Sequence, residues 1–137
     1  MKGDATTPDR AAPDSPLAIL REVFGYESFR GQQAAVIDEV AAGRDALVLM
    51  PTGGGKSLCY QVPAIVRERA GHGLTVVVSP LIALMEDQVA KLCERGFRAE
   101  RIHSGRDRMA SRQACRDYLD GNLDFLFIAP AAAWRWW

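Results

Sequence analysis

The sequence of 137 residues has no excess of charge of either sign, because 17 lysines and arginines balance 17 aspartates and glutamates. This balance excludes a polybasic protein that coats DNA. With 48% apolar and 25% charged residues, the chain is neither wholly disordered nor a collagen-like fibre. Long hydrophobic runs are absent too, and no stretch approaches the ~20 apolar residues that cross a bilayer. Residues 1–16 have no apolar core of the kind found in signal peptides, so we expect a cytoplasmic protein without membrane contact.

Cysteine is scarce, with three residues that lie far apart in the sequence and form no CxxC pair: Cys59, Cys93 and Cys115. Neither a zinc site nor a disulfide framework fits this spacing. We therefore expect all three cysteines to be small apolar side chains in the core.

Apolar periodicity and glycine positions divide the chain into alternating helices and strands. Ser15 followed by Pro16 is typical of the start of a helix. Helices are predicted over residues 16–24, 32–42, 56–69, 81–95 and 107–119, and strands over residues 46–50, 74–78, 99–103 and 125–129. The first two strands are continuous apolar runs, which predicts burial on both faces. This order predicts an α/β fold with a mainly parallel sheet and helices on both of its faces.

Residues 50–57 read Met-Pro-Thr-Gly-Gly-Gly-Lys-Ser and lie between a predicted strand and a predicted helix, the context of a phosphate-binding loop. Four consecutive residues can offer backbone N–H groups to phosphate oxygens, and three of them have no obstructing Cβ: Thr52, Gly53, Gly54 and Gly55. The start of the following helix adds a partial positive charge. Lys56 can reach the β- and γ-phosphates, and the Ser57 hydroxyl can coordinate Mg²⁺. The general consensus has glycine where this chain has Met50, and a glycine-rich turn that binds nothing is the alternative.

Residues 50–61, Met-Pro-Thr-Gly-Gly-Gly-Lys-Ser-Leu-Cys-Tyr-Gln, resemble the first motif of RecQ-family DNA helicases. Upstream, the segments Phe-Gly-Tyr and Phe-Arg-Gly-Gln-Gln within residues 24–33 resemble the adenine-recognition motif of that family, with Gly-Gln replacing the usual Pro-Gly. The resemblance implies that Tyr26 stacks on adenine, that Gln33 reads its edge and that Arg30 supports both. An amide suits this role because it donates and accepts hydrogen bonds. Packing of the aromatic rings and an exposed helix start for Gln33 are the alternatives.

Residues 78–89 resemble motif Ia of the same family, which contacts the backbone of single-stranded DNA. The resemblance implies DNA contacts by Ser79 and Gln88, and a strand that leads into a helix N-terminus suits phosphate binding. Three apolar residues of this motif are expected in the core: Leu81, Leu84 and Met85. Residues 127–130 resemble the start of motif Ib, but Ala-Ala-Ala-Trp follows where the family has Glu-Arg-Leu.

The resemblance covers about residues 17–130 and implies a RecA-like P-loop NTPase domain that is truncated. We expect a flexible leader at residues 1–15, the partial domain at residues 16–130, and an atypical tail at residues 131–137 that contains all three tryptophans. The function implied is the ATP-binding N-terminal part of a RecQ-like 3′–5′ DNA helicase that acts in repair and recombination. ATP and Mg²⁺ would be its cofactors, and single-stranded DNA and duplex junctions its partners.

ATP hydrolysis in the family also needs an Asp-Glu-Ala-His motif, which this sequence does not contain. The acidic pair at residues 38–39 follows apolar residues, but helical spacing predicts a solvated helix face for it. We therefore expect little turnover from this chain alone. A catalytically inactive nucleotide- or DNA-binding remnant is the alternative function, and an unrelated nucleotide kinase or GTPase is a third.

Arginines outnumber acidic residues in residues 94–117. Arg108, Arg112 and Arg116 share one face of a predicted helix, where like charges cost ~0.2–0.5 kcal/mol per pair unless an anion lies opposite. A phosphate-facing stripe and a solvated surface are both compatible with this pattern. His103 has no evident partner in the sequence and is expected to be structural.

Overall fold

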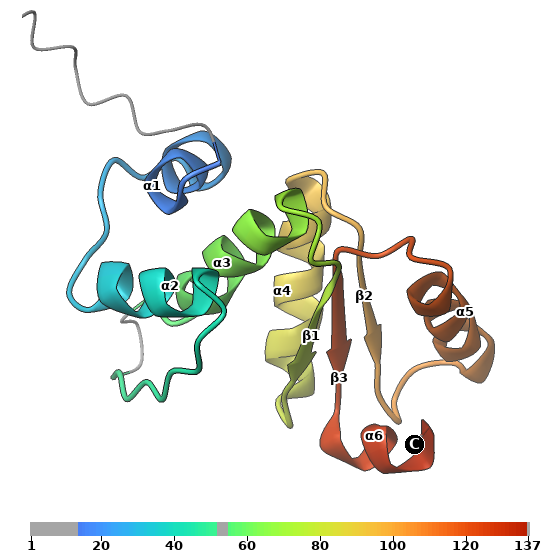
Figure 1. Cartoon of the computed structure of the whole chain (residues 1–137). Helices are drawn as coiled ribbons and strands as arrows, with labels where there is room; N and C mark the ends of the chain where they lie inside the picture. Colours follow the sequence, from blue (N-terminus) through green and yellow to red (C-terminus); the bar gives the residue numbers. More distant parts are fainter. Residues whose placement is uncertain (1–13, 52–54, 137) are drawn as a thin grey trace, which may run out of the picture. The chain divides into compact units, whose positions relative to one another are not determined.

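A computed structural model of the chain describes residues 14–51 and 55–136, with side chains described up to residue 133 (Figure 1). Most of the predicted leader and the loop residues Thr52, Gly53 and Gly54 lie outside the described residues. The chain forms two compact units, residues 1–71 and residues 72–137, and each is considered by itself.

The first unit is helical in its described part. It consists of α1 (Pro16–Ile19), which continues as a π-helical turn η1 (Leu20–Phe24), then α2 (Gln33–Ala41) and α3 (Leu58–Arg69). As predicted, the Ser15 hydroxyl caps α1 by accepting the Ala18 N–H at 3.2 Å, and Gly25 ends η1 in the left-handed conformation. Helix α3 packs against α1 and α2. Five apolar side chains are almost completely buried among these helices: Ile19, Leu20, Ile37, Val62 and Ile65.

The predicted strand at residues 46–50 is wrong. These residues have no regular secondary structure, and the side chains of Leu47 and Leu49 are 93% and 87% exposed. A strand needs a neighbour whose backbone can pair with its N–H and C=O groups. The described part of residues 1–71 contains no other strand to provide that pairing.

The second unit contains a parallel sheet of three strands: β1 (Thr75–Val78), β2 (Ala99–Ile102) and β3 (Phe125–Ile128). Strand β3 is central in the order β1-β3-β2, and Phe125 is in register with Thr75 and with Ala99. Helices α4 (Ile82–Glu94) and α5 (Arg108–Leu119) lie on opposite faces of this sheet, and α6 (Pro130–Trp136) follows β3 (Figure 1). The predicted α/β class with a parallel sheet is therefore confirmed.

Burial differs along the three strands. All four side chains of β3 are buried because helices cover both faces of the central strand, and Phe97 packs edge-on against Phe125 at 6.0 Å. Strand β1 pairs only with β3 and is an edge among the described strands. Val76 and Val78 are 47% and 59% exposed, so the prediction that residues 74–78 are buried on both faces is wrong.

Helix α4 also corrects two expectations. Its buried face consists of Met85, as predicted, together with Val89 and Leu92. Leu81 precedes the first helical residue and Leu84 lies off this face, so both are exposed rather than in the core.

The cysteines differ from one another in burial. Cys59 is buried as expected, Cys115 is half-buried, and Cys93 is exposed. Cys93 follows the last residue of the buried face of α4, so the helix turns it outward, and only its Sγ approaches the Ala99 carbonyl at 3.6 Å. No helix in the described ranges has the length and apolarity that a membrane span requires.

Candidate nucleotide-binding site

Gln33 joins the predicted adenine-recognition segment to the predicted phosphate loop. It is the first residue of α2, and its side chain is buried although polar, with 2% of its surface exposed. Its Oε1 accepts the Arg30 N–H at 2.8 Å, and its Nε2 donates to the Gly55 carbonyl at 3.2 Å. A donor on one side and an acceptor on the other fix the orientation of the amide. The alternative that Gln33 is an exposed residue at a helix start is therefore wrong.

Gly55 is a position where glycine is required for two reasons. Its φ of 77° lies in the left-handed region, which side chains with a Cβ rarely adopt. A Cβ at this position would also collide with Nε2 of Gln33. Residue 55 can therefore lie this close to Gln33 of α2 only because it has no side chain.

Lys56 and Ser57 form the turn that leads into α3. The Lys56 carbonyl accepts the Cys59 N–H at 3.0 Å, and the Ser57 carbonyl accepts the Gln61 N–H at 2.9 Å. The Lys56 side chain is exposed and has no ion-pair partner among residues 14–51 and 55–136, and the Ser57 hydroxyl does not cap the helix. A cation at a helix N-terminus without an acidic neighbour is unfavourable unless an anion binds there. Both side chains are therefore available for a phosphate and its cation.

Tyr26 and Arg30 lie on the exposed side of the same region. The Tyr26 ring is 53% exposed, and its backbone N–H donates to the Leu20 carbonyl at 3.3 Å. The backbone of Arg30 is hydrogen-bonded to Gln33, while its side chain is exposed. An exposed aromatic ring and an exposed cation can contact a nucleotide without displacing packed side chains. Phe24 and Phe29 are half-buried.

A divalent cation would have few protein ligands here. The described residues include no cluster of three or more His, Cys, Asp or Glu side chains that could hold a metal ion. Mg²⁺ commonly keeps several waters and binds substrate phosphates, so one hydroxyl beside a phosphate loop fits its chemistry. Asp38 and Glu39 do not contribute, because both are exposed on α2 and Glu39 pairs with Arg44 at 2.7 Å. The expectation of a solvated helix face is confirmed for these two acids.

The residues predicted to contact DNA lie in the second unit. Ser79 follows the carboxyl end of β1, and its Oγ accepts the Leu81 N–H at 3.2 Å. Gln88 is half-buried in the second turn of α4. Ser79 therefore has a local role at the start of α4, and its hydroxyl hydrogen remains available to a ligand.

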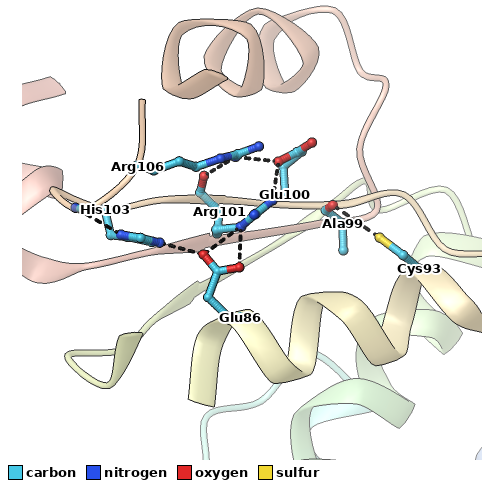
Figure 2. Close-up of polar contacts among 8 residues, drawn as sticks. Glu86, Cys93, Ala99, Glu100, Arg101, His103 and Arg106 are labelled. Carbon is cyan, nitrogen blue, oxygen red and sulfur yellow. Dashed lines mark hydrogen bonds and ion pairs between the residues drawn. The ribbon is translucent and has the colours of Figure 1, made fainter. Parts of the chain in front are cut away.

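Sequence reasoning missed a cluster of charged residues between α4 and β2 (Figure 2). Both carboxylate oxygens of Glu86 accept the Arg101 Nε–H at 2.9 Å, and Oε1 lies 2.7 Å from Nε2 of His103. Arg101 and, secondly, His103 hold the pKa of Glu86 below its ordinary value of 4.5. Nδ1 of His103 accepts the Gly105 N–H at 3.2 Å, so Nε2 carries the proton and donates to Glu86. His103 is structural, as predicted, with a partner that the sequence did not indicate.

The opposite face of β2 carries a second pair. Glu100 accepts from Arg106 at 2.6 Å, and the same guanidinium donates to the Arg101 carbonyl at 2.7 Å (Figure 2). The alternation of side chains along a strand explains this division, because residues 100 and 102 face one side and residues 101 and 103 the other. The two pairs together fix the loop after β2, residues 103–106.

Known proteins resemble this chain over most of its length. The sequence model of a family described as "DEAD/DEAH box helicase" matches residues 30–135. The chain is 44% identical over 85% of its length to the ATP-dependent helicase SGS1 of Saccharomyces cerevisiae, covering 8% of that protein. It is 46% identical to the ATP-dependent DNA helicases RecQ of Pasteurella multocida and of a Synechocystis species, over 83% and 81% of its length. It spans 17% and 22% of those two proteins.

Proposed function

Because this chain belongs to the DEAD/DEAH box helicase family and is a relative of the RecQ helicases, we propose that it is the ATP-binding part of a RecQ-like DNA helicase. Its α/β fold with a parallel sheet is accordingly a truncated RecA-like domain. Residues 16–130 would be the partial ATP-binding domain, with residues 1–15 a leader and residues 131–137 an atypical tail. The helicase would couple ATP hydrolysis to 3′–5′ unwinding of DNA in repair and recombination.

The observation that carries this proposal is the hydrogen bond between Gln33 and Gly55. Two segments 22 residues apart, one resembling an adenine-recognition motif and the other a phosphate loop, meet through a buried amide. A glycine-rich turn that binds nothing would not require a neighbouring glutamine of this orientation. The contact supports one nucleotide site formed by both segments.

The side chains suit distinct parts of ATP. Tyr26 offers a ring for stacking on adenine, and Arg30 a cation beside it. Gln33 would read the adenine edge with the second N–H and the second oxygen lone pair of its amide, which the bonds to Gly55 and Arg30 leave unused. Lys56 neutralises charge on the β- and γ-phosphates, and backbone N–H groups of residues 52–55 would surround their oxygens. Ser57 would hold Mg²⁺, which supplies charge neutralisation across the β- and γ-phosphates when bound. These groups bind and orient the nucleotide.

Hydrolysis requires a further acidic group that orients the attacking water, and the sequence has no Asp-Glu-Ala-His motif. A nucleotide- and DNA-binding protein without turnover is the second candidate for the 137-residue chain, and a turnover assay separates the two. In either case Ser79 and Gln88 would contact the backbone of single-stranded DNA, and duplex junctions would be the substrate of the helicase.

A binding titration of the 137-residue chain with fluorescent ATP and Mg²⁺ tests the nucleotide site. We expect Lys56→Ala to weaken binding by about tenfold or more, because it removes charge-assisted hydrogen bonds to phosphate. Lys91→Ala is the matched control, since Lys91 is exposed and pairs with Asp87 in the other unit. Equal affinity of the Lys56 variant and the wild type would refute the site.

Nucleotide preference and turnover separate the remaining functions. We expect the wild type to bind ATP more tightly than GTP and Gln33→Ala to reduce that preference, because the amide reads the adenine edge. A preference for GTP would favour an unrelated GTPase. DNA-stimulated turnover by the 137-residue chain would exclude the binding protein without turnover.

A further inference from the structure

The unit formed by residues 72–137 contains an open pocket of about 440 Å³ beside the carboxyl end of β2. Small-molecule sites usually have volumes of about 300–1,000 Å³. The lining comes from the loop after β2, the first turns of α5 and the start of α6, and it includes three arginines and two serines. No acidic side chain of the described residues lines it. The pocket is therefore electropositive.

Arg108 and Arg112 place charge where their own helix disfavours it. Arg108 is the first residue of α5 and Arg112 lies one turn further, so both stand at the positive end of the helix dipole. They are also like charges at i and i+4. Both are exposed and have no ion-pair or hydrogen-bond partner in the described part of the chain. An anion in the pocket would relieve each of these unfavourable interactions.

Ser111 provides an independent indication of a ligand. Its side chain lines the pocket and only 6% of its surface is exposed. Its hydroxyl has no hydrogen-bond partner within the described residues, although buried polar groups are nearly always hydrogen-bonded. Serine is also a weak helix former, so helix propensity does not account for it here. A ligand oxygen would satisfy the hydroxyl.

The other polar residues of the pocket hold its wall in place. Arg106 is neutralised by Glu100, and both ring nitrogens of His103 are used by Glu86 and Gly105 (Figure 2). These bonds fix the loop after β2 before any ligand arrives.

We infer that this pocket binds a phosphate group through the guanidinium groups of Arg108 and Arg112 and the hydroxyl of Ser111. Two cations and a separate hydroxyl donor match an anion with several oxygens pointing in different directions, and arginine pairs well with phosphate. The phosphate comes either from the backbone of a nucleic-acid strand or from a free phosphate-bearing molecule. The strand source rests on the DNA binding proposed above, whereas the free source does not.

Fluorescence anisotropy of the 137-residue chain with a labelled single-stranded oligothymidylate, measured over a series of salt concentrations, tests the strand source. We expect Arg108→Gln and Arg112→Gln each to weaken binding by about tenfold. Each should also lower the slope of log affinity against log salt by about 0.7, the value for one phosphate contact in a single strand. Ser111→Ala should weaken binding about two- to tenfold without changing the slope, because it removes a hydrogen bond and no charge.

Arg116→Gln is the matched control, because Arg116 lies on the same helix, carries the same charge and bonds to Gln113 rather than lining the pocket. We expect it to bind the oligonucleotide within about twofold of the wild type. Inorganic phosphate provides the second arm. If it raises the unfolding temperature of the wild type but not of Ser111→Ala or Arg112→Gln, while the oligonucleotide affinities are unchanged, the free source is correct.

Two results would overturn the inference. One is no effect of the three pocket variants in either arm. The other is an equal effect of Arg116→Gln, which would indicate attraction by the charge of the helix as a whole. These variants and probes do not involve the phosphate loop. If Lys56→Ala bound ATP as tightly as the wild type, the nucleotide site would be refuted, but the test of the pocket would still stand.

Discussion

Removing the carboxylate of Glu86 tests the charged cluster between α4 and β2 most directly. Glu86→Ala leaves the Nε2–H of His103 without a partner, and His103 is 7% exposed. An unsatisfied buried donor costs about 1–3 kcal/mol. The lost pair with Arg101 adds about 0.2–1 kcal/mol, because both side chains are partly exposed and solvent screens their charges. We therefore expect the free energy of unfolding of residues 72–137 to fall by about 1–4 kcal/mol.

Hydrogen exchange of the β3 amides is a suitable assay, because amides of a central buried strand exchange mainly when the whole unit opens. Each loss of 1.4 kcal/mol should accelerate this exchange about tenfold. Glu86→Gln should lose less, since its amide oxygen can still accept from His103. Glu94→Ala is the control, an exposed carboxylate at the end of the same helix, with an expected change within about 0.5 kcal/mol.

Exchange in Glu86→Ala at the rate of Glu94→Ala would refute the reasoning. It would mean that His103 finds another acceptor or that water reaches it, and the cluster would then not hold the loop after β2. Faster exchange in Glu86→Gln than in Glu86→Ala would also contradict the assignment of the proton to Nε2.

Three further perturbations have definite expected outcomes. The lowered pKa of Glu86 means that its contribution to stability is present above 4.5 and lost as pH falls through the folded-state pKa. The protection of the β3 amides, which is the exchange rate divided into the intrinsic rate at the same pH, should therefore fall more in the wild type than in Glu86→Gln on acidification. Gly55→Ala should lower the free energy of unfolding by about 1–2 kcal/mol, measured by urea unfolding, because residue 55 has a positive φ. It should also weaken ATP binding, measured by titration, because the new Cβ would collide with Gln33. Gly71→Ala, with a φ of 88° and open space around its Cβ, should show the strain alone. Arg112→Gln should stabilise the ligand-free chain by about 0.2–0.5 kcal/mol for each like-charge pair removed, measured by thermal unfolding. A loss of stability would mean that Arg112 has an ion-pair or hydrogen-bond partner in the folded chain.

Local signals predicted the elements that depend on local interactions. The Ser15–Pro16 start of α1 and the end of the first helical segment at Gly25 are each decided within one or two helical turns. The order of strands and helices then predicted a parallel sheet, because parallel neighbours require a crossover between them. These features could be predicted from the sequence alone.

The site could be predicted only as a set of residues. The resemblance named Gln33 and Gly55 separately, but the bond between them joins residues 22 positions apart and has no local signature. The same applies to Glu86 and His103, which are 17 positions apart. Alternation along β2 could have grouped residues 101 and 103 on one face, yet it could not identify the residue of α4 opposite them.

The apolar runs at residues 46–50 and 74–78 show why burial is harder to predict than secondary structure. An apolar run indicates that exposure to water is unfavourable, at about 25 cal/mol for each Å² of apolar surface, but not which surface covers it. At β3 the covering elements are helices on both faces of the sheet, and all four side chains of that strand are buried. At Val76 and Val78 only one neighbouring strand is described, and at Leu47 and Leu49 none is. The pocket beside α5, in contrast, is lined by residues of its own unit. Its proposed ligand can therefore be tested on this chain.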